Sequence, residues 1–239
     1  MPKLILSAVP ILRQTYISKI LGMNPLAFWP MNEASGTTCK DISGSGYNGT
    51  YANVTLAQPG IGDGATTASF NGINSSANVF SAGLAGAIND QEYTIMMWAK
   101  VSGAGVWTDG AQRRMCFFGF GADPSNDHFY LRKNTTNNQV RLGRAGTALP
   151  HKSIDHTIST TSWFHIGMTC SKANDRLKLF INGTQSGATA DTLQEILNTL
   201  TVALLGCYSG AFYWSGLLGR VALFDRELSS AEMSRAGRV

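Results

Sequence analysis

Histidines and carboxylates are the residues of this chain that could perform acid–base or metal chemistry. His128 and His165 lie in strand-like stretches, whereas His151 and His156 lie near a loop. No G-x-S-x-G or H-E-x-x-H motif surrounds them. The glutamates of the strand-rich part are equally dispersed: Glu92, Glu195, Glu227 and Glu232. We therefore expect that the protein is not an enzyme and has no catalytic residue.

The cysteines could bind zinc or form disulfides, but their spacing fits neither a metal site nor a redox motif. They are far apart and include no C-x-x-C pair: Cys39, Cys116, Cys170 and Cys207. Their apolar, strand-like surroundings favour buried thiols and a reducing compartment, with one or two disulfides as the alternative.

The glycine-rich stretch 24–51, NPLAFWPMNEASGTTCKDISGSGYNGTY, contains two acids that could bind a metal or a substrate. Its glycines permit the positive φ values of a crowded turn, and the carboxylate of Asp41 can accept hydrogen bonds from the amides of that turn. We therefore expect a strand followed by an elaborate turn, with Glu33 and Asp41 as loop acceptors rather than catalysts.

Composition and charge favour one β-rich domain with few charged partners. The 239 residues are 44% apolar and only 14% charged, and 26 of them are glycines, a balance typical of short strands joined by tight turns. Three of the four net positive charges come from Lys3, Arg13 and Lys19, so the body is nearly neutral and we expect no nucleic-acid partner. No apolar stretch reaches the length of about 18–20 residues of a membrane helix, so we expect no membrane contact.

The first 24 residues differ from the rest and predict an N-terminal arm, either a short helix or an extended anchor, before a sandwich over 25–239. An apolar run over 4–12 follows a lysine, and residues 11–21 show one apolar helical face. Residues predicted to bind a partner through this arm are Leu4, Leu6, Val9, Ile11, Leu12, Ile17 and Ile20. A signal peptide is one alternative, against which Pro10 and Arg13 argue. The other is an element packed on its own sandwich.

Alternating hydrophobicity predicts a series of strands bounded by turn residues. In YTIMMWAKV (93–101) the alternation places Ile95 and Met97 on one face and Met96 and Trp98 on the other. Further strands are predicted over 114–120, 128–133, 138–143, 162–170, 176–183, 201–208 and 212–225.

Two short helices and one hairpin turn interrupt the predicted strands. Each helix, over 191–200 and 229–237, begins with a capping-box pattern. Asn182-Gly183 predicts a tight turn between two strands.

An ordered set of segments in this chain resembles the concanavalin A-like, laminin-G-like jelly roll. The segments are LAFWPMNEASGTTCKDISGSGYNGTY (26–51), ASFNG (68–72), YTIMMWAKV (93–101), SWFHIGMT (162–169), LKLFINGT (177–184) and GRVALFDRELSSAEM (219–233). The resemblance implies an all-β, two-sheet antiparallel jelly-roll sandwich. In such a fold Trp29, Trp98 and Trp163 would fill the gap of about 10 Å between the sheets.

The resemblance also raises calcium binding and glycoside hydrolysis, because relatives perform both. Many relatives carry an acid after the glycine of the last strand, where this chain reads Gly219-Arg220, so we expect no metal and no cofactor. If calcium did bind, Asp41 with nearby carbonyl oxygens would be the first candidate. Hydrolases of this fold pair their carboxylates as E-x-D-x-x-E, which is absent from this chain.

Sugar-binding sandwiches stack aromatic side chains on sugar rings. The candidates are Trp107 in a glycine-rich loop and the cluster Tyr208, Phe212, Tyr213 and Trp214. We predict possible glycan-binding residues at Trp107, Tyr213 and Trp214, with packing in the protein's own core as the alternative.

An apolar arm, one sandwich and no catalytic set together resemble the sandwich domains of phage virion proteins. The resemblance implies a non-enzymatic capsid decoration, head-fibre or tail accessory protein that binds other virion proteins, forms a homo-oligomer and adheres to surface glycans. A carbohydrate-binding lectin-like domain, extracellular or an accessory module of an enzyme, is the alternative.

Overall fold

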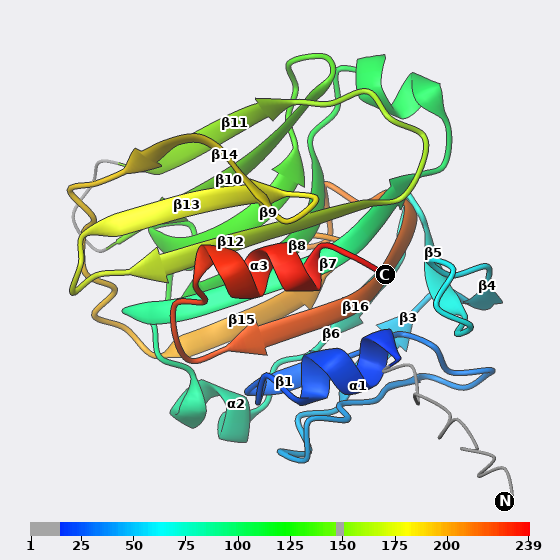
Figure 1. The fold of residues 1–239 in the computed structure, drawn as a ribbon, viewed down its shortest axis with the longest axis horizontal. Coiled ribbons are helices and arrows are strands. Elements are labelled where there is room, and N and C mark those ends of the chain that lie inside the picture. The colour runs from blue at the N-terminus through cyan, green and yellow to red at the C-terminus, as the bar shows by residue number, and fades with distance from the viewer. Residues whose placement is uncertain (1–14, 147–150) are drawn as a thin grey trace, which may run out of the picture.

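The computed structural model describes residues 15–146 and 151–239, and the statements below concern these residues. Leu4, Leu6, Val9, Ile11 and Leu12 of the predicted arm lie outside them. Two eight-stranded sheets pack face to face, and every strand pair in both is antiparallel (Figure 1). The predicted all-β sandwich is therefore confirmed.

The first sheet lies nearer the viewer in Figure 1 and is centred on two long strands, β7 (Glu92–Val101) and β16 (Ser215–Phe224). Its path runs from β14 (Thr184–Ala190) through β13 (Arg176–Ile181), β12 (Phe164–Ser171), β7, β16 and β5 (Thr67–Asn71) to β4 (Thr55–Gln58), and β1 (Ala27–Trp29) pairs with β16.

The second sheet lies behind the first and is formed mainly by the middle of the chain. Its path runs from β11 (Lys152–Thr157) through β10 (Gln139–Ala145), β9 (Asp127–Lys133), β8 (Arg113–Phe120), β15 (Leu200–Leu205), β6 (Ser76–Asn78) and β3 (Gly49–Ala52) to β2 (Thr38–Cys39).

The main core lies between the sheets and follows the predicted alternation of β7. Ile95 and Met97 point into this core with Trp29, which fills the gap as predicted. Met96 and Trp98 point to the outer face of the first sheet, so the prediction that Trp98 lies between the sheets is wrong. All four cysteines are buried free thiols, as the sequence indicated.

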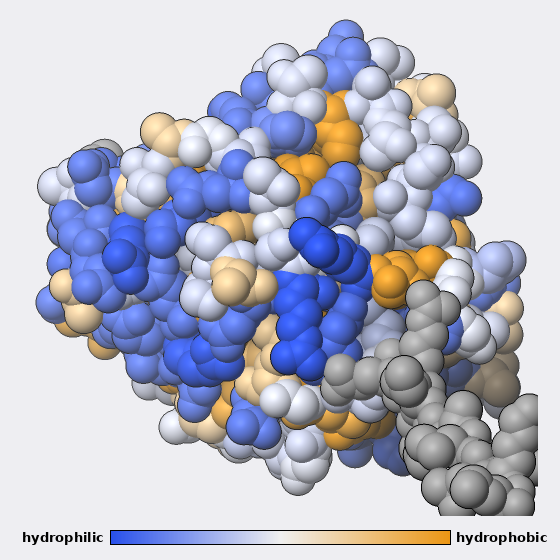
Figure 2. Space-filling view, in the orientation of Figure 1, coloured by the Kyte–Doolittle hydropathy of each residue, from blue (hydrophilic) through white to orange (hydrophobic). Residues whose placement is uncertain are grey.

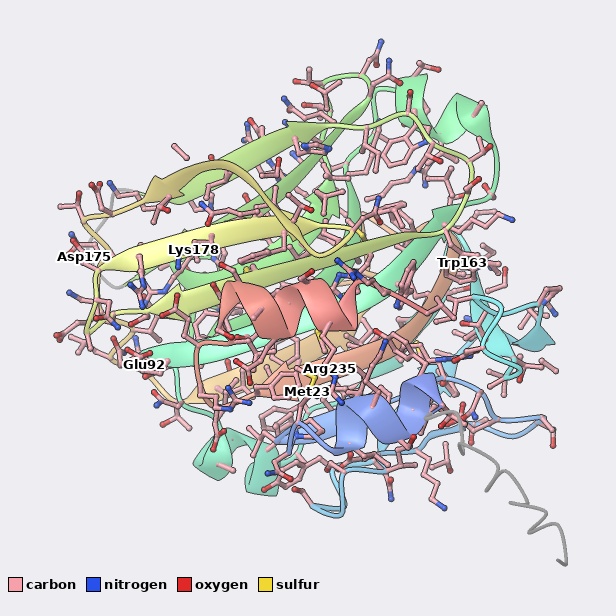
Figure 3. All side chains as sticks on the ribbon, viewed as in Figure 1. Met23, Glu92, Trp163, Asp175, Lys178 and Arg235 are labelled. Atoms are coloured by element: carbon pink, nitrogen blue, oxygen red, sulfur yellow. The ribbon has the colours of Figure 1, made fainter. Side chains whose placement is uncertain are left out.

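A second apolar cluster explains why the outer face of the first sheet is also buried. The helices α1 (Tyr16–Leu21) and α3 (Ser230–Ala236) cover this face, with Met23 and Arg235 between them (Figures 1 and 3). Trp163 lies at the far end of the same face, only partly buried against the cluster.

The two ends of the described chain meet on this face. The Tyr16 hydroxyl donates to the carbonyl of Ala236 (2.9 Å), and the Lys19 ammonium donates to the carbonyl of Arg238. Figure 2 shows the same face in space-filling form: its visible surface is mostly polar, with small separate apolar areas. No helix among the described residues is long and apolar enough to cross a membrane.

One of the two predicted helices forms and the other does not. The capping box predicted at Ser229 and Glu232 begins α3. Residues 191–199 are irregular, because the Asp175 carboxylate accepts the amides of Thr192 (2.8 Å) and Leu193 (2.7 Å), and Thr192 has φ +56°. The short helices α2 (Ala82–Ala87) and η1 (Ala104–Thr108) were not predicted.

Candidate functional site

Two of the three predicted glycan-binding residues lie in the core. Trp107 is 1% exposed, its ring lies beside Phe164, and its indole N–H donates to the carbonyl of Thr160 (2.8 Å). Trp214 is fully buried and donates to the carbonyl of Leu217 (3.2 Å). Packing in the protein's own core, the alternative, therefore holds for both tryptophans, and neither ring is available to a sugar, whereas Tyr213 is half-buried and reaches the surface.

The described part of the predicted arm packs on its own sandwich. Ile20 is fully buried and Ile17 is partly buried, both against the cluster beneath α1 and α3. The Thr15 side chain accepts the amide of Ser18 (3.1 Å) and so caps α1. Ile20 is therefore not available to a partner, and the alternative of an element packed on its own sandwich describes this segment.

Asp41 and Glu33 act as hydrogen-bond acceptors within the segment 24–51, as predicted. The carboxylate of Asp41 accepts the amides of Phe28, Ser43 and Tyr47, each at 2.9 Å. Glu33 accepts the amide of Lys40 (2.7 Å) and the hydroxyl of Tyr51 (2.9 Å). Protein donors thus surround the oxygens that calcium would need. No group of three His, Cys, Asp or Glu side chains suited to a metal occurs in the described part of the chain.

A buried arginine lies where the resemblance raised an acidic residue. Arg220 is 0% exposed, and its guanidinium forms a bidentate ion pair with Asp63 (2.7 and 2.8 Å). It also donates to the carbonyls of Pro30 (2.9 Å), Thr66 (2.7 Å) and Ala65 (2.9 Å). Burial alone would raise the pKa of Asp63, but the hydrogen bonds and charge of Arg220 outweigh burial and lower it. The guanidinium of Arg220 is thus surrounded by carboxylate and carbonyl oxygens of the protein itself.

The outer face of the second sheet carries a stack of rings and arginines. Tyr130 of β9 lies flat across β10 at Gly143, where a Cβ atom would overlap the ring. The Arg114 guanidinium lies over the ring of Tyr130, 3.8 Å from the ring centroid. Such stacking suits the planar, weakly hydrated guanidinium.

A β-bulge in β8 places Arg114 in this stack. The pairing of β8 with β9 shifts register between Arg114 and Cys116. Cys116 points into the main core, and regular alternation would send Arg114 there too. Arg114 instead lies beside Phe117, with its guanidinium 5.7 Å from the ring centroid.

A tight turn adds two more rings at the edge of the stack. Tyr208 and Ala211 exchange backbone hydrogen bonds, and the turn uses positive φ at Ser209 (+47°) and Gly210 (+70°). The ring of Tyr208 lies against that of Phe117, with centroids 4.0 Å apart and planes tilted by 36°. Phe212 lies nearly parallel to Tyr208, with ring centroids 6.2 Å apart. Phe212 is 41% exposed. We call Arg114, Phe117, Tyr130, Tyr208 and Phe212 the outer aromatic surface; Phe117 (1% exposed) and Tyr130 (2%) are buried within it, and Tyr208 and Phe212 form its accessible edge.

Positive charge surrounds this surface. Burial lowers the pKa of Arg114 to about 10, and Arg132 acts in the same direction, so Arg114 remains cationic at neutral pH. Burial, followed by the charges of Arg132, Arg141 and Arg114, lowers the pKa of the exposed His151. Burial, His151 and Arg114 lower the pKa of His128 to about 4. Both histidines are therefore neutral at pH 7 among three arginines.

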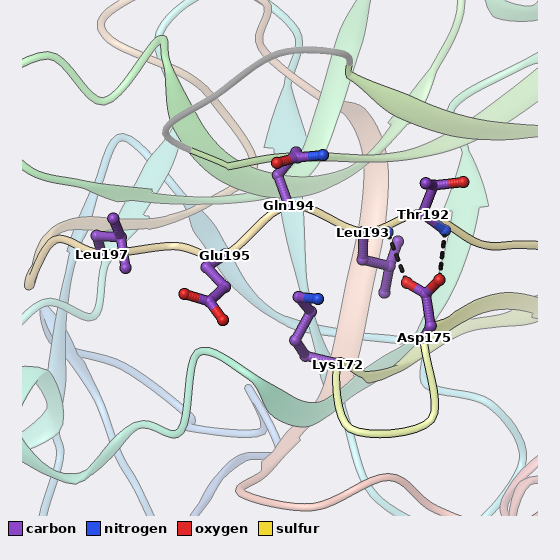
Figure 4. A pocket seen from close by; sticks show the side chains of 7 residues that line it. All are labelled: Lys172, Asp175, Thr192, Leu193, Gln194, Glu195 and Leu197. Atoms are coloured by element: carbon purple, nitrogen blue, oxygen red, sulfur yellow. Dashed lines mark hydrogen bonds between the residues drawn. The ribbon is translucent and has the colours of Figure 1, made fainter.

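A hollow of about 500 Å³ at one end of the sandwich is the other candidate (Figure 4). Its lining is Lys172, Asp175, Thr192, Leu193, Gln194, Glu195 and Leu197. Hydrogen bonds from the amides of Leu193 and Thr192 lower the pKa of Asp175, which suits a loop acceptor rather than a catalytic acid. The hollow has no aromatic ring in its lining, so it offers a sugar polar groups without a stacking surface.

Sequence reasoning named Tyr208 and Phe212 but missed the arginine and tyrosine at the centre of the stack. A signal was present in HFYLRK (128–133), where His128, Tyr130 and Arg132 alternate with Phe129 and Leu131. Phe129 and Leu131 occupy the core, so the other three share the outer face. The bulge that turns Arg114 to the outer face of the sheet left no comparable signal.

Two packed antiparallel sheets, one of which carries rings and arginines on its outer face, define a lectin-like β-sandwich. The sequence profile of the concanavalin A-like lectin/glucanases superfamily matches residues 48–234, and the protein belongs to this superfamily. The comparison with curated protein sequences finds no match.

Solved structures of similar fold come from larger proteins with different roles. The binding domain of botulinum neurotoxin serotype D superposes with a TM-score of 0.67 at 15% identity, over 93% of this chain and 52% of that one. Domain 4 of a GH43 extracellular arabinanase from Geobacillus stearothermophilus, solved with arabinotriose, superposes with a TM-score of 0.65 at 17% identity. The superposition covers 90% of this chain and 98% of that one. A sialidase from Trypanosoma rangeli superposes with a TM-score of 0.64 at 16% identity, over 90% of this chain and 32% of that one. This chain thus spans about half of the toxin domain. At these identities the likeness shows the fold alone.

Proposed function

We propose that this protein is a non-enzymatic carbohydrate-binding domain that holds a glycan on the outer aromatic surface. The observation that carries the proposal is the stack of Tyr130, Arg114 and the rings of Tyr208 and Phe212 on one sheet face. Aromatic rings can cover the apolar C–H face of a sugar, and guanidinium N–H groups can donate to its oxygens. Both kinds of group converge at the edge where Phe212 is exposed.

The superfamily and its structural neighbours support a binding role. The toxin neighbour is described as a binding domain, and the arabinanase neighbour is one domain of a larger enzyme, solved with an arabinose oligosaccharide. Both descriptions fit a domain whose contribution is attachment.

The non-enzymatic part of the proposal is supported by how the carboxylates are used. Glu227 pairs with Arg176 (2.7 Å) and Lys178 (3.1 Å), and Glu232 pairs with Arg226 (2.7 Å) while it caps α3. Hydrolysis of a glycosidic bond needs two carboxyl groups that flank that bond. Glu227 and Glu232 thus serve ion pairs and a helix cap.

The exposed edge of the surface allows a direct binding test with a matched control. Phe212→Ala should lower the affinity for a glycan found by array screening at least tenfold, because it removes the exposed ring. Phe80→Ala is the control, since Phe80 is an exposed phenylalanine of similar exposure (39%) outside this surface. Equal loss in both variants, or no glycan bound by the folded protein, would contradict the proposal.

We further propose, from the sequence of the arm, that the protein is a virion component. The apolar and basic residues 1–24 suit an anchor for capsid or tail proteins, in a decoration, head-fibre or tail accessory protein, with an extracellular location as the alternative. Light scattering should give a trimer or larger for the full chain and a folded monomer without residues 1–14. Identical masses for both would count against an anchoring arm.

A further inference from the structure

Arg114 has hydrogen-bonding groups that the protein itself does not use. The residue is 7% exposed, and its Nε and Nη1 atoms are buried without a hydrogen-bond partner among the described residues. The Nε atom of Arg132 is in the same state, although its other nitrogens donate to Gln112 (2.6 Å) and Asn134 (3.2 Å). Buried donors of charged groups are costly to leave unpaired, so this arrangement points to an acceptor from outside the chain.

The charges around the outer aromatic surface are unbalanced. Arg141 forms a bidentate pair with Asp155 (2.5 and 2.7 Å) on the same sheet. Neither Arg114 nor Arg132 forms an ion pair with a carboxylate in the described ranges, unlike Arg113, Arg176, Arg220 and Arg226. Arg114 in this surface and its neighbour Arg132 are therefore two cations without an ion-paired carboxylate among the described residues.

We propose that the outer aromatic surface selects an acidic sugar, a pyranose with a carboxylate of the uronic or sialic type, whose carboxylate meets the Arg114 guanidinium. This inference rests on the proposed function and adds the class of ligand. A guanidinium binds a planar carboxylate through two parallel N–H donors, a geometry that neutral hydroxyls do not match. The stacked ring of Tyr130 holds the guanidinium in a fixed plane, so less side-chain freedom is lost on binding.

The neighbouring rings define how such a sugar would lie. The guanidinium of Arg114 is 5.7 Å from the ring centroid of Tyr208 and 6.0 Å from that of Phe212. A pyranose that lies on the exposed Phe212 ring would therefore place its carboxylate beside Arg114. A nucleic acid is a poorer fit, because the body of the chain carries little net positive charge.

A matched set of sugars separates charge selection from sugar binding. Glucuronic acid, its uncharged methyl ester and glucose share one ring, and their affinities can be measured by titration calorimetry or by NMR titration. The unmodified protein should bind glucuronic acid at least tenfold more tightly than the ester or glucose. This comparison needs no variant, so it is independent of any folding defect.

Variants then assign the effect to the residue. Arg114→Gln should bring the affinity for glucuronic acid down to that for the ester, with the affinity for the ester unchanged. Arg176→Gln, which removes a cation from the opposite face, should leave all three affinities unchanged. If Arg114→Gln does not fold, as judged by circular dichroism, Arg132→Gln should lower the preference for the acid in its place.

Two results would overturn the inference, and they are distinguishable. Equal affinities for the three sugars would show that the surface binds sugars without selecting the charge, so that only the inference fails. No binding of any of the three, together with no hit on a glycan array, would remove the proposed function as well.

Discussion

Replacement of Arg220 by methionine is expected to destabilise the protein by about 3–5 kcal/mol, the usual cost of removing one partner from a buried ion pair. All five N–H groups of the guanidinium are used, two on Asp63 and three on the backbone carbonyls of Pro30, Ala65 and Thr66. Methionine is similar in length but has no donor. The variant would leave the Asp63 carboxylate, itself only 3% exposed, without its counter-charge.

A matched control separates the buried pair from ion pairs in general. Arg226 pairs with Glu232 at the same distance, 2.7 Å, but their side chains are 42% and 33% exposed. Because solvent screens exposed pairs, Arg226→Met should cost no more than about 1 kcal/mol. Arg220 has φ +57°, and methionine keeps the β-carbon, so backbone strain at this position is the same before and after the change.

Urea unfolding followed by tryptophan fluorescence gives both free energies of unfolding. The difference in free energy of unfolding between the unmodified protein and Arg220→Met should also depend on pH. Since the folded pKa of Asp63 lies below the unfolded value of about 3.9, its stabilisation is complete above that value and is lost as the pH falls through the folded pKa. The gap between unmodified protein and Arg220→Met should therefore narrow in acid. A loss for Arg220→Met no greater than that for Arg226→Met at neutral pH would refute the reasoning.

Two further predictions concern a buried histidine and a glycine beneath the stack. Burial, with a smaller contribution from the charge of Lys19, lowers the pKa of His165 to about 3. Because the unfolded chain protonates this histidine first, the free energy of unfolding should decline as the pH falls from about 6.5 toward 3. His165→Phe should remove this part of the pH dependence, measured by urea unfolding over that range. An unchanged slope would count against this assignment. Gly143→Ala should destabilise the protein by about 1–3 kcal/mol, because the new Cβ overlaps Tyr130. In the same assay Gly86→Ala, in α2 with open space around it, should stabilise it by up to about 1 kcal/mol; similar effects at both glycines would be inconsistent with the packing described for Tyr130.

Local patterns were sufficient wherever a residue's own neighbours decide its state. The alternation of β7 predicted which side chains face the core, and the glycine-rich turn predicted that Asp41 accepts backbone amides. The Asn182-Gly183 turn lies between β13 and β14, with φ of +49° and +77°. Each of these features depends on residues close in sequence.

Contacts between distant residues decided the predictions that failed. The segment 191–199 has a helical pattern, but Asp175 accepts its first amides and holds it irregular. Trp107 lies in a loop that looks exposed in the sequence, yet η1 turns its ring toward Phe164. Arg114 reaches the outer aromatic surface only because β8 shifts register against β9. A periodic pattern contains no information about such pairings.

Helix α1 and the last described residues meet on the outer face of the first sheet, opposite the outer aromatic surface. Tyr16 bonds to Ala236 there, whereas Arg114 and Phe212 lie on the outer face of the other sheet, across the thickness of the sandwich. A support that binds the face covered by α1 and α3 would leave the outer aromatic surface pointing away from it. Copies arrayed in this way would meet a glycan-covered surface face first, and weak contacts of single domains would add up through multivalency.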